Sequence, residues 1–312
     1  MKVSIKINKR MPTQQNLYTQ QSSNNTKTFF LMMAFIGLIF GIGYFLSYYY
    51  GNPFILWFAL GGALLMNFMS YWFSDKVVLK LAHAREATRE EYFDLYTIVE
   101  NLSITAGLPM PKVYVMDDAV PNAFATGRNK DHAVVVFSTG LLAILEKPEL
   151  EGVAAHELAH IGNKDILLQT VVVTLVGTIG LIADFFLRMT MFGGRGNDRN
   201  GNAIVLVIGV ALMILMPIIA TLLKLAISRK REFAADATGA LLSRYPEGLA
   251  SALEKIEQYS GTMKHANHAT AHLYISNPFN MKKDKESFLN KIFRTHPPTH
   301  ERIAALRGVE IK

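Results

Sequence analysis

The sequence predicts a mainly α-helical membrane protein that also contains a small β-sheet, and three observations lead to this fold class. Half of the 312 residues are hydrophobic and the mean hydropathy is +0.20, both high for a water-soluble protein. Four apolar runs are long enough to be membrane-spanning helices. Two short runs rich in valine have the length and composition of β-strands.

The charge and the cysteine count exclude several classes of protein. The formal net charge is +7, and positive residues gather beside the apolar runs, where anionic lipid headgroups are their natural partners. No basic stripe interleaved with aromatic residues is present, which argues against a nucleic-acid partner. The chain contains no cysteine, so disulfides, thiolate catalysis and cysteine-based zinc sites are excluded.

The first two apolar runs predict a helical hairpin in the bilayer. Residues 29–49 and 53–73 each contain 21 residues without a charge, and about 20 apolar residues cross the hydrocarbon core as a helix. Gly51 and Asn52 lie between the runs, so a tight turn is expected there. Residues 1–28 include a stretch rich in Gln, Asn, Ser and Thr, which predicts a disordered tail rather than a cleavable signal.

The other two runs predict a second hairpin over residues 166–223. Residues 166–187 contain one acid, Asp184, and residues 203–223 contain Pro217, which is tolerated in a membrane helix. Four membrane spans are therefore expected, and a partly inserted or buried core hairpin is the alternative for this second pair. Residues 75–165 and 224–312 are expected to form the two parts of one water-facing domain.

The distribution of Lys and Arg predicts the orientation in the membrane. The first 28 residues carry five basic residues and no acid, and Lys76 and Lys80 follow the second run. The positive-inside rule then places the N-terminus and both water-facing segments in the cytoplasm. The loop between the third and fourth runs contains Arg188, Arg195 and Arg199. These positive charges argue weakly against this orientation.

The valine-rich runs, VYVM at 113–116 and AVVVF at 133–137, are expected to be paired strands joined by a turn over 125–132. Residues 122–126 would then lie along a strand beside a cleft, and an exposed strand edge can bind an extended peptide by backbone pairing. The candidate substrate-binding residues are Asn122, Ala123, Phe124 and Ala125. The alternative is an ordinary hairpin with no role in binding.

The strongest chemical signal is the HELAH motif. Residues 149–165 read ELEGVAAHELAHIGNKD and predict a helix that ends near Gly162. His156 and His160 are four residues apart, so they project from one helix face and can bind a single zinc ion. Glu157 lies beside the first ligand, where it can act as general base toward a water molecule at the metal. The alternative is an amphipathic helix with two surface histidines.

A catalytic zinc needs a third protein ligand, and the sequence offers one on a second helix. The metzincin pattern would require Gly at 163 and His at 166, but the chain has Asn163 and Ile166. In SRKREFAADATGALL, residues 228–242, Glu232 can be the third ligand and Asp236 can support a ligand histidine from behind. Asp165 is a further candidate for such support. The alternative is a helix with two solvated acids.

Taken together, these segments resemble the HtpX-type membrane zinc endopeptidases, gluzincins related to the CAAX prenyl proteases. The likeness covers nearly all of the chain after residue 28, with HELAH, the later EFAAD, NAFATG at 122–127 and the C-terminal THPPTHERI at 295–303. It implies a gluzincin-type catalytic domain with His156, His160 and Glu232 as ligands of one Zn²⁺ per chain, and Glu157 as base. In the C-terminal segment, His296 and Arg302 are candidates to stabilise an oxyanion, and a plain capped helix after Pro298 is the alternative.

The resemblance also implies a biological setting. Its members act in the bacterial inner membrane, where they remove misfolded or damaged membrane proteins beside other quality-control proteases. The closeness of His160 to the predicted start of the third run places the site near the cytoplasmic membrane face. A non-catalytic membrane scaffold is the competing hypothesis, and an enzyme restricted to C-terminal peptides is another. A second metal site at His265, His268 and His272 is weighed against a surface loop.

Overall fold

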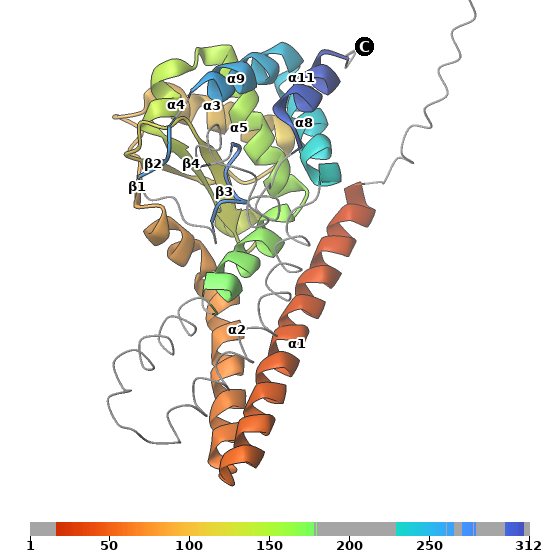
Figure 1. The fold of residues 1–312 in the computed structure, drawn as a ribbon. Helices are drawn as coiled ribbons and strands as arrows, with labels where there is room; N and C mark the ends of the chain where they lie inside the picture. The colour runs from red at the N-terminus through yellow and green to blue at the C-terminus, as the bar shows by residue number, and fades with distance from the viewer. Residues whose placement is uncertain are drawn as a thin grey trace, which may run out of the picture.

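The computed structural model describes residues 17–177, 179, 229–259, 261–264, 270–276, 278 and 297–308. Within these residues the molecule is mostly helical with one small mixed sheet, as expected (Figure 1). The fourth apolar run and the whole loop before it lie outside the described residues, as do His296, His265 and His268. Four membrane spans therefore remain a prediction.

Two long helices form a hairpin that projects from the rest of the molecule, α1 (Leu17–Tyr50) and α2 (Phe54–Leu81) (Figure 1). The chain reverses at Gly51, whose φ of +64° suits glycine, and the Asn52 side chain accepts a hydrogen bond from the Phe54 amide at 3.0 Å. Both helices are long and apolar enough to cross a membrane. They keep large apolar side chains exposed, among them Phe30, Tyr48, Phe54, Trp57, Phe58 and Leu65.

The expected disordered tail over residues 1–28 is wrong for residues 17–28. Helix α1 already begins at Leu17, well before the apolar run. Asn24 and Thr28 are buried although they are polar, and Asn24 bonds to residues more than a hundred positions away. Composition alone does not show such contacts, since they exist only after the chain has folded.

The third apolar run begins as a short helix, Asp165–Gly177. Most of its apolar side chains are buried, and Leu168, Val171 and Leu175 share a core cluster with Leu31 and Phe35 of α1. The remainder of this run lies outside the described residues. The helix therefore connects the preceding helix, which carries the HELAH motif, to the α1–α2 hairpin.

The sheet has four strands in the order β1-β2-β4-β3, namely β1 (Ala84–Glu86), β2 (Lys112–Met116), β4 (Ala133–Ser138) and β3 (Ala123–Gly127). The two expected strands are present, but the expected hairpin between them is wrong, because β2 and β4 run parallel. Strand β3 lies between them in sequence and pairs antiparallel with β4 at the sheet edge. Every residue of β4 is buried, and a run of apolar residues on both faces is typical of a central strand.

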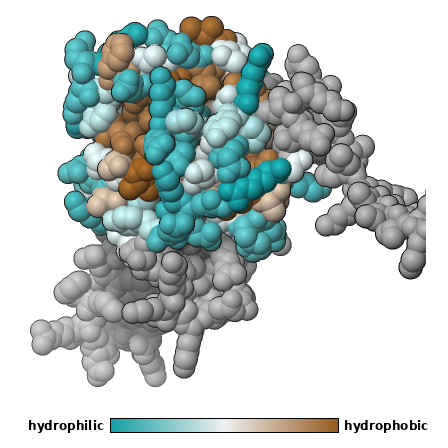
Figure 2. Space-filling model, turned by 90° about the horizontal axis from the view of Figure 1, so that it is seen from above, coloured by the Kyte–Doolittle hydropathy of each residue, from teal (hydrophilic) through white to brown (hydrophobic). Residues whose placement is uncertain are grey.

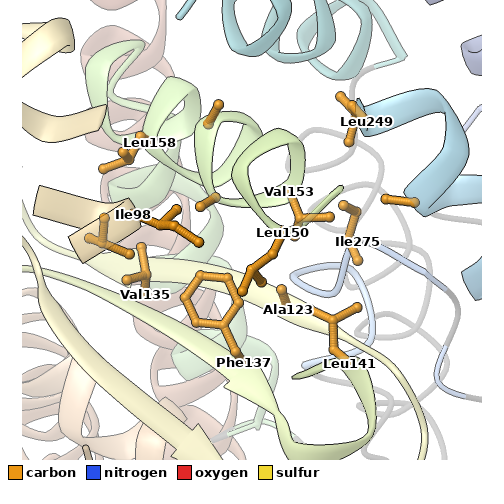
Figure 3. Close-up of a cluster of buried hydrophobic side chains, with 14 of the residues drawn as sticks. Ile98, Ala123, Val135, Phe137, Leu141, Leu150, Val153, Leu158, Leu249 and Ile275 are labelled. Atoms are coloured by element: carbon orange, nitrogen blue, oxygen red, sulfur yellow. The ribbon is translucent and has the colours of Figure 1, made fainter. Parts of the chain in front are cut away.

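The two faces of the sheet pack against different parts of the chain. One face, with Val135 and Phe137, packs under α3 (Phe93–Ala106), α5 (Lys147–Gly162) and α9 (Pro246–Gln258) (Figure 3). The other face, with Phe124 and Val136, packs against the end of α2 and against Tyr274. The described helices are completed by α4 (Thr139–Ile144), α8 (Arg229–Ser243) and α11 (Thr299–Arg307).

Two glycines let helices approach α5 closely. A Cβ on Gly152 would lie 2.5 Å from the Leu249 nitrogen of α9, and a Cβ on Gly239 of α8 would lie 2.9 Å from the His156 nitrogen. Helix α5 is thus enclosed by the sheet and by two helices. Figure 2 views the end of the molecule away from the hairpin tip, and that face is mostly hydrophilic with separate apolar patches.

Candidate metal centre

Helix α5 brings two histidine rings together inside the molecule. His156 and His160 lie one turn apart on it, and both are almost completely buried. Their Nε2 atoms face each other at 3.2 Å. The alternative of two surface histidines is wrong, because α8, α9 and the sheet cover this helix face.

Helix α8 supplies the third group that the sequence predicts. Glu232 is buried, with Oε1 3.7 Å from His160 Nε2 and Oε2 4.0 Å from His156 Nε2. Ligand atoms of these three residues all lie within 4.8 Å of one another. About seventy residues separate the two helices in sequence, and the contact between α5 and α8 at Gly239 brings them together.

The donor set fits a tetrahedral metal ion. Ligands bound at about 2.0–2.1 Å in tetrahedral geometry lie roughly 3.3 Å apart, close to the 3.2, 3.7 and 4.0 Å found here. Both Nδ1 atoms face carboxylates, which favours Nδ1–H and directs the two Nε2 atoms at one another. Two ring nitrogens this close beside a carboxylate need a cation between them, either a proton on His160 or a metal ion.

The surrounding charges also favour a cation. Burial lowers the pKa of His160, but Asp165, Glu232 and Glu157 outweigh burial and raise this pKa to about 9. At His156 burial dominates over the attraction of Asp236 and lowers the pKa to about 4. A positive charge near His160 Nε2 is therefore stabilised in spite of burial.

Both predicted supporting acids occupy the predicted positions. Asp236 Oδ1 lies 2.9 Å from His156 Nδ1, and Asp165 Oδ2 lies 3.1 Å from His160 Nδ1. Burial raises the pKa of Asp236, but Arg302 and His156 outweigh burial and lower it to about 2. Each histidine ring is thus held in orientation by a carboxylate on the side away from the ligand site.

Arg302 has a different position from the one expected of an oxyanion-stabilising group. This buried residue of α11 donates from Nε and Nη2 to the two carboxylate oxygens of Asp236, at 2.9 and 2.6 Å. Its Nη1 donates to the Ile275 carbonyl at 3.3 Å. Arg302 therefore holds Asp236, which holds His156. Helix α11 begins directly after Pro298, as the alternative interpretation expected.

Glu157 lies inside the site beside the edge strand. Its side chain is buried, and its carboxylate accepts a hydrogen bond from the Ala125 backbone N–H of β3. Burial raises the pKa of Glu157 to about 7, with Glu232 adding to the rise and His160 opposing it. A carboxyl group of this kind can both take and return a proton near neutral pH.

The predicted substrate strand exists, but it is not an open edge along its whole length. Ile275 donates its backbone N–H to the Ala123 carbonyl at 2.9 Å, which occupies that position of β3. Asn122 uses its side chain to hold the same segment, donating to the Ser276 carbonyl at 3.0 Å and accepting from the Ser276 amide at 3.2 Å. Phe124 points to the opposite face and stacks edge-on with Tyr274. Ala125 contacts the Glu157 carboxylate through its backbone N–H.

Several contributing residues escaped prediction from sequence. Arg231 is buried beside the site, with Nε 3.7 Å from Asp165 Oδ1, and its place next to Glu232 was the available signal. Asn24 was assigned to a disordered tail; the polar pair Asn24 and Thr28, four residues apart before an apolar run, was the signal that could have found it.

Of the weighed second metal site, the structure describes only His272. This residue is buried, and its Nε2 lies 3.3 Å from the Gln169 carbonyl oxygen. The other two histidines of that site lie outside the described residues.

Known proteins were compared with the chain by sequence and by fold. The sequence pattern of Peptidase family M48 matches residues 90–310, which contain all the ligand and supporting residues named above except Asn24. The chain belongs to peptidase family M48. A metallopeptidase of this family uses a metal ion, and the buried His156–His160–Glu232 group is compatible with binding one.

Within family M48 the chain groups with the HtpX proteases. It is 44% identical over 305 residues to a "Protease HtpX homolog" of Thermoanaerobacter pseudethanolicus, covering 95% of this chain and 99% of the relative. It is 47% identical over 285 residues to one of Pyrococcus furiosus, covering 90% and 95% of the two chains. With two helices able to span a membrane, this M48 member is a membrane metallopeptidase.

A solved structure supports the same M48 fold. The Ste24p structure of S. mikatae superposes with a TM-score of 0.50 at 19% sequence identity, covering 93% of this chain and 67% of that chain. At this identity the likeness concerns the fold alone.

Proposed function

We propose that the chain is a zinc-dependent endopeptidase that hydrolyses peptide bonds of misfolded or damaged membrane proteins at the cytoplasmic face of the bacterial inner membrane. The observation that carries the proposal is the placement of Glu157 beside the His156–His160–Glu232 group and against the edge strand β3. In this proposal the general base, the metal-binding group and the strand edge that would bind a peptide lie next to one another.

Each residue has a distinct task in this proposal. His156, His160 and Glu232 would hold one Zn²⁺, which when bound polarises the scissile carbonyl and lowers the pKa of a coordinated water toward about 7. The Glu157 carboxylate accepts the proton of the attacking water and then donates it to the leaving amine nitrogen. Asp165 and Asp236 keep the two imidazole rings in the orientation that directs Nε2 at the ion.

Strand β3 offers limited room for substrate pairing. Backbone groups of Ala123 and Ala125 point to the same side of β3, because alternate residues of a strand do so, and Asn122 points its carbonyl to β4 instead. Since Ile275 occupies the Ala123 carbonyl and Glu157 accepts from the Ala125 N–H, an extended substrate would pair with the Ala125 carbonyl, directly beside Glu157. This position suits cleavage within a short extended stretch of an unfolded chain.

The connection of the site to the hairpin supports a membrane-associated substrate. Asp165, which holds His160, is also the first residue of the helix that packs on α1. The ligand group therefore lies close to the base of the apolar hairpin. Unfolded segments next to the bilayer would be nearest to it.

The proposed activity is tested with the full chain purified in detergent, incubated with an unfolded protein and zinc. Glu157→Gln is the test variant, because it keeps the side-chain volume and removes the base. Wild type is expected to cut at internal bonds, and Glu157→Gln and chelator-treated wild type are expected to be inactive. Zinc bound to an inactive wild type would favour the non-catalytic scaffold, and release of only C-terminal peptides would favour the restricted enzyme.

The proposed topology is tested by cysteine labelling, for which the natural chain offers no background. Asn52→Cys at the hairpin turn and Glu254→Cys on the exposed side of α9 are the two reporters. An impermeant thiol reagent is expected to label the Asn52→Cys variant in intact cells, and the Glu254→Cys variant only after permeabilisation. The reverse pattern would contradict a cytoplasmic site.

A further inference from the structure

Asn24 of α1 is a buried polar residue, and both the nitrogen and the oxygen of its side-chain amide form hydrogen bonds. It is 3% exposed. Its Nδ2 donates to Asp165 Oδ1 at 2.7 Å and to the Asn163 carbonyl at 3.3 Å. Its Oδ1 accepts from Arg231 Nη1 at 3.3 Å. One side chain thus joins the N-terminal helix to the ends of α5 and α8 that flank the ligand site.

Asp165 stands between Asn24 and a metal ligand. Its Oδ2 faces His160 Nδ1 at 3.1 Å, while its Oδ1 receives the bond from Asn24. Rotation of the carboxylate group would break both contacts together, since the two oxygens are fixed to one carbon. A bond to Oδ1 therefore restricts the direction in which Oδ2 holds the His160 ring.

We infer that Asn24 is a positioning residue of the metal centre, acting through Asp165 on His160. The inference rests on the proposed metal-binding role of His156, His160 and Glu232. It extends the active site to α1, which lies outside the segment that matches the peptidase family. The metal site is then complete only when the N-terminal helix is docked against it.

The burial of these groups explains why one amide has a measurable effect. A buried carboxylate that loses a hydrogen-bond donor must reorient or remain partly unsatisfied, and Arg231 would lose an acceptor at the same time. Asp165, Arg231 and His160 are nearly inaccessible to water, which cannot easily replace the missing amide. The contact thus has consequences for His160, beyond anchoring α1.

The test measures zinc affinity of the full chain in detergent by competition with a chromophoric chelator. Asn24→Leu keeps a similar volume and removes both hydrogen-bonding functions, while Asn25→Leu on the exposed side of the same helix is the matched control. Loss of a group that orients a metal ligand typically costs about 10- to 100-fold in metal affinity. Asn24 acts on His160 only through Asp165, so the zinc affinity of Asn24→Leu is expected to fall by roughly 3- to 10-fold. The zinc affinity of Asn25→Leu is expected to equal that of wild type.

A double-mutant cycle separates positioning from a merely structural role. In an Asp165→Ala background, Asn24→Leu is expected to cause no further loss of zinc affinity, because the route to His160 is already cut. Equal fold-losses in both backgrounds would overturn the inference. Asn24→Gln, which retains the amide on a longer side chain, is expected to recover part of the affinity, and it serves as the test variant if Asn24→Leu does not fold.

His160→Ala distinguishes a failure of this inference from a failure of the proposed function. If His160→Ala binds zinc as wild type does, the ligand assignment itself is wrong. If His160→Ala loses zinc while Asn24→Leu and Asn24→Gln bind it like Asn25→Leu, the ligand assignment stands and Asn24 only anchors α1.

Discussion

Arg302 and Asp236 form a buried pair in which the guanidinium group contacts both carboxylate oxygens, at 2.9 and 2.6 Å. The pair joins the C-terminal helix α11 to α8, on the Nδ1 side of His156 in the candidate metal centre. The C-terminal segment thus helps to position His156. The same construction appears at the second histidine, where Asp165 lies on the Nδ1 side of His160.

Loss of Arg302 is expected to weaken both stability and metal binding. Removing one partner of a buried ion pair typically costs about 3–5 kcal/mol, because the other charge remains buried. Arg302→Met should therefore lower the thermal unfolding temperature and the zinc affinity together. Arg307→Met is the control on the same helix, since Arg307 pairs with Glu247 and Glu254 at the surface, and it should change neither quantity appreciably. Equal effects of the two variants would contradict a special role for Arg302.

Metal removal is expected to destabilise the folded chain. A metal ion bound between the Nε2 atoms of His156 and His160 and the nearby Glu232 carboxylate would stabilise this group, and a ligand that binds only the folded state raises stability by mass action. A strong chelator should lower the unfolding temperature, and added zinc should restore it. The His160→Ala variant should show little response to either treatment, and a full response would place the bound metal elsewhere.

Glu157→Gln is expected to separate catalysis from metal binding. Proton transfer by a positioned general base contributes about 10²- to 10⁴-fold to a rate, so peptide hydrolysis should fall by at least that factor. The zinc content measured by mass spectrometry should equal that of wild type, because Glu157 is not among the three converging ligands. A variant that loses zinc as well would show that Glu157 contributes to the ligand group.

Gly239→Ala is expected to disturb His156 through the backbone. The added Cβ would lie 2.9 Å from the His156 nitrogen and 3.1 Å from its Cα, so α8 and α5 would have to separate. Forced overpacking of this kind costs about 1–3 kcal/mol, and zinc affinity should fall with stability. Gly62→Ala in α2 meets no atom within 4 Å and is the control; alanine is the better helix former there. Wild-type behaviour of Gly239→Ala would contradict the tight packing.

Prediction from sequence succeeded where a local pattern has one physical meaning. The spacing of His156 and His160 fixes two imidazoles on one helix face, whatever the rest of the chain does. The uncharged runs of the hairpin are long enough to span a bilayer, and the structure has helices over both. Glu232 and Asp236 were found because a third ligand was required and one helix offered two acids four residues apart.

Prediction failed where the answer depends on contacts between distant segments. The valine-rich composition of 113–116 and 133–137 identifies strands but not their direction, so the parallel pairing of β2 and β4 was missed. The polar composition around Asn24 suggested disorder, because the buried partners that satisfy its amide lie at residues 163–165 and 231. The motif around Arg302 indicated a functional residue without showing that its guanidinium group faces Asp236.

The sequence by itself therefore determined the local elements of the proposed chemistry: a helix with two histidines and an adjacent glutamate, a separate helix with a carboxylate, and an apolar hairpin. These follow from residue type and helical spacing, which are local properties of the chain. Only the tertiary structure decided how Asn24, Asp165, Arg231, Asp236 and Arg302 surround the ligands. Hydrogen bonds and ion pairs among buried groups depend on distances of a few tenths of an ångström, and packing of the whole chain sets those distances.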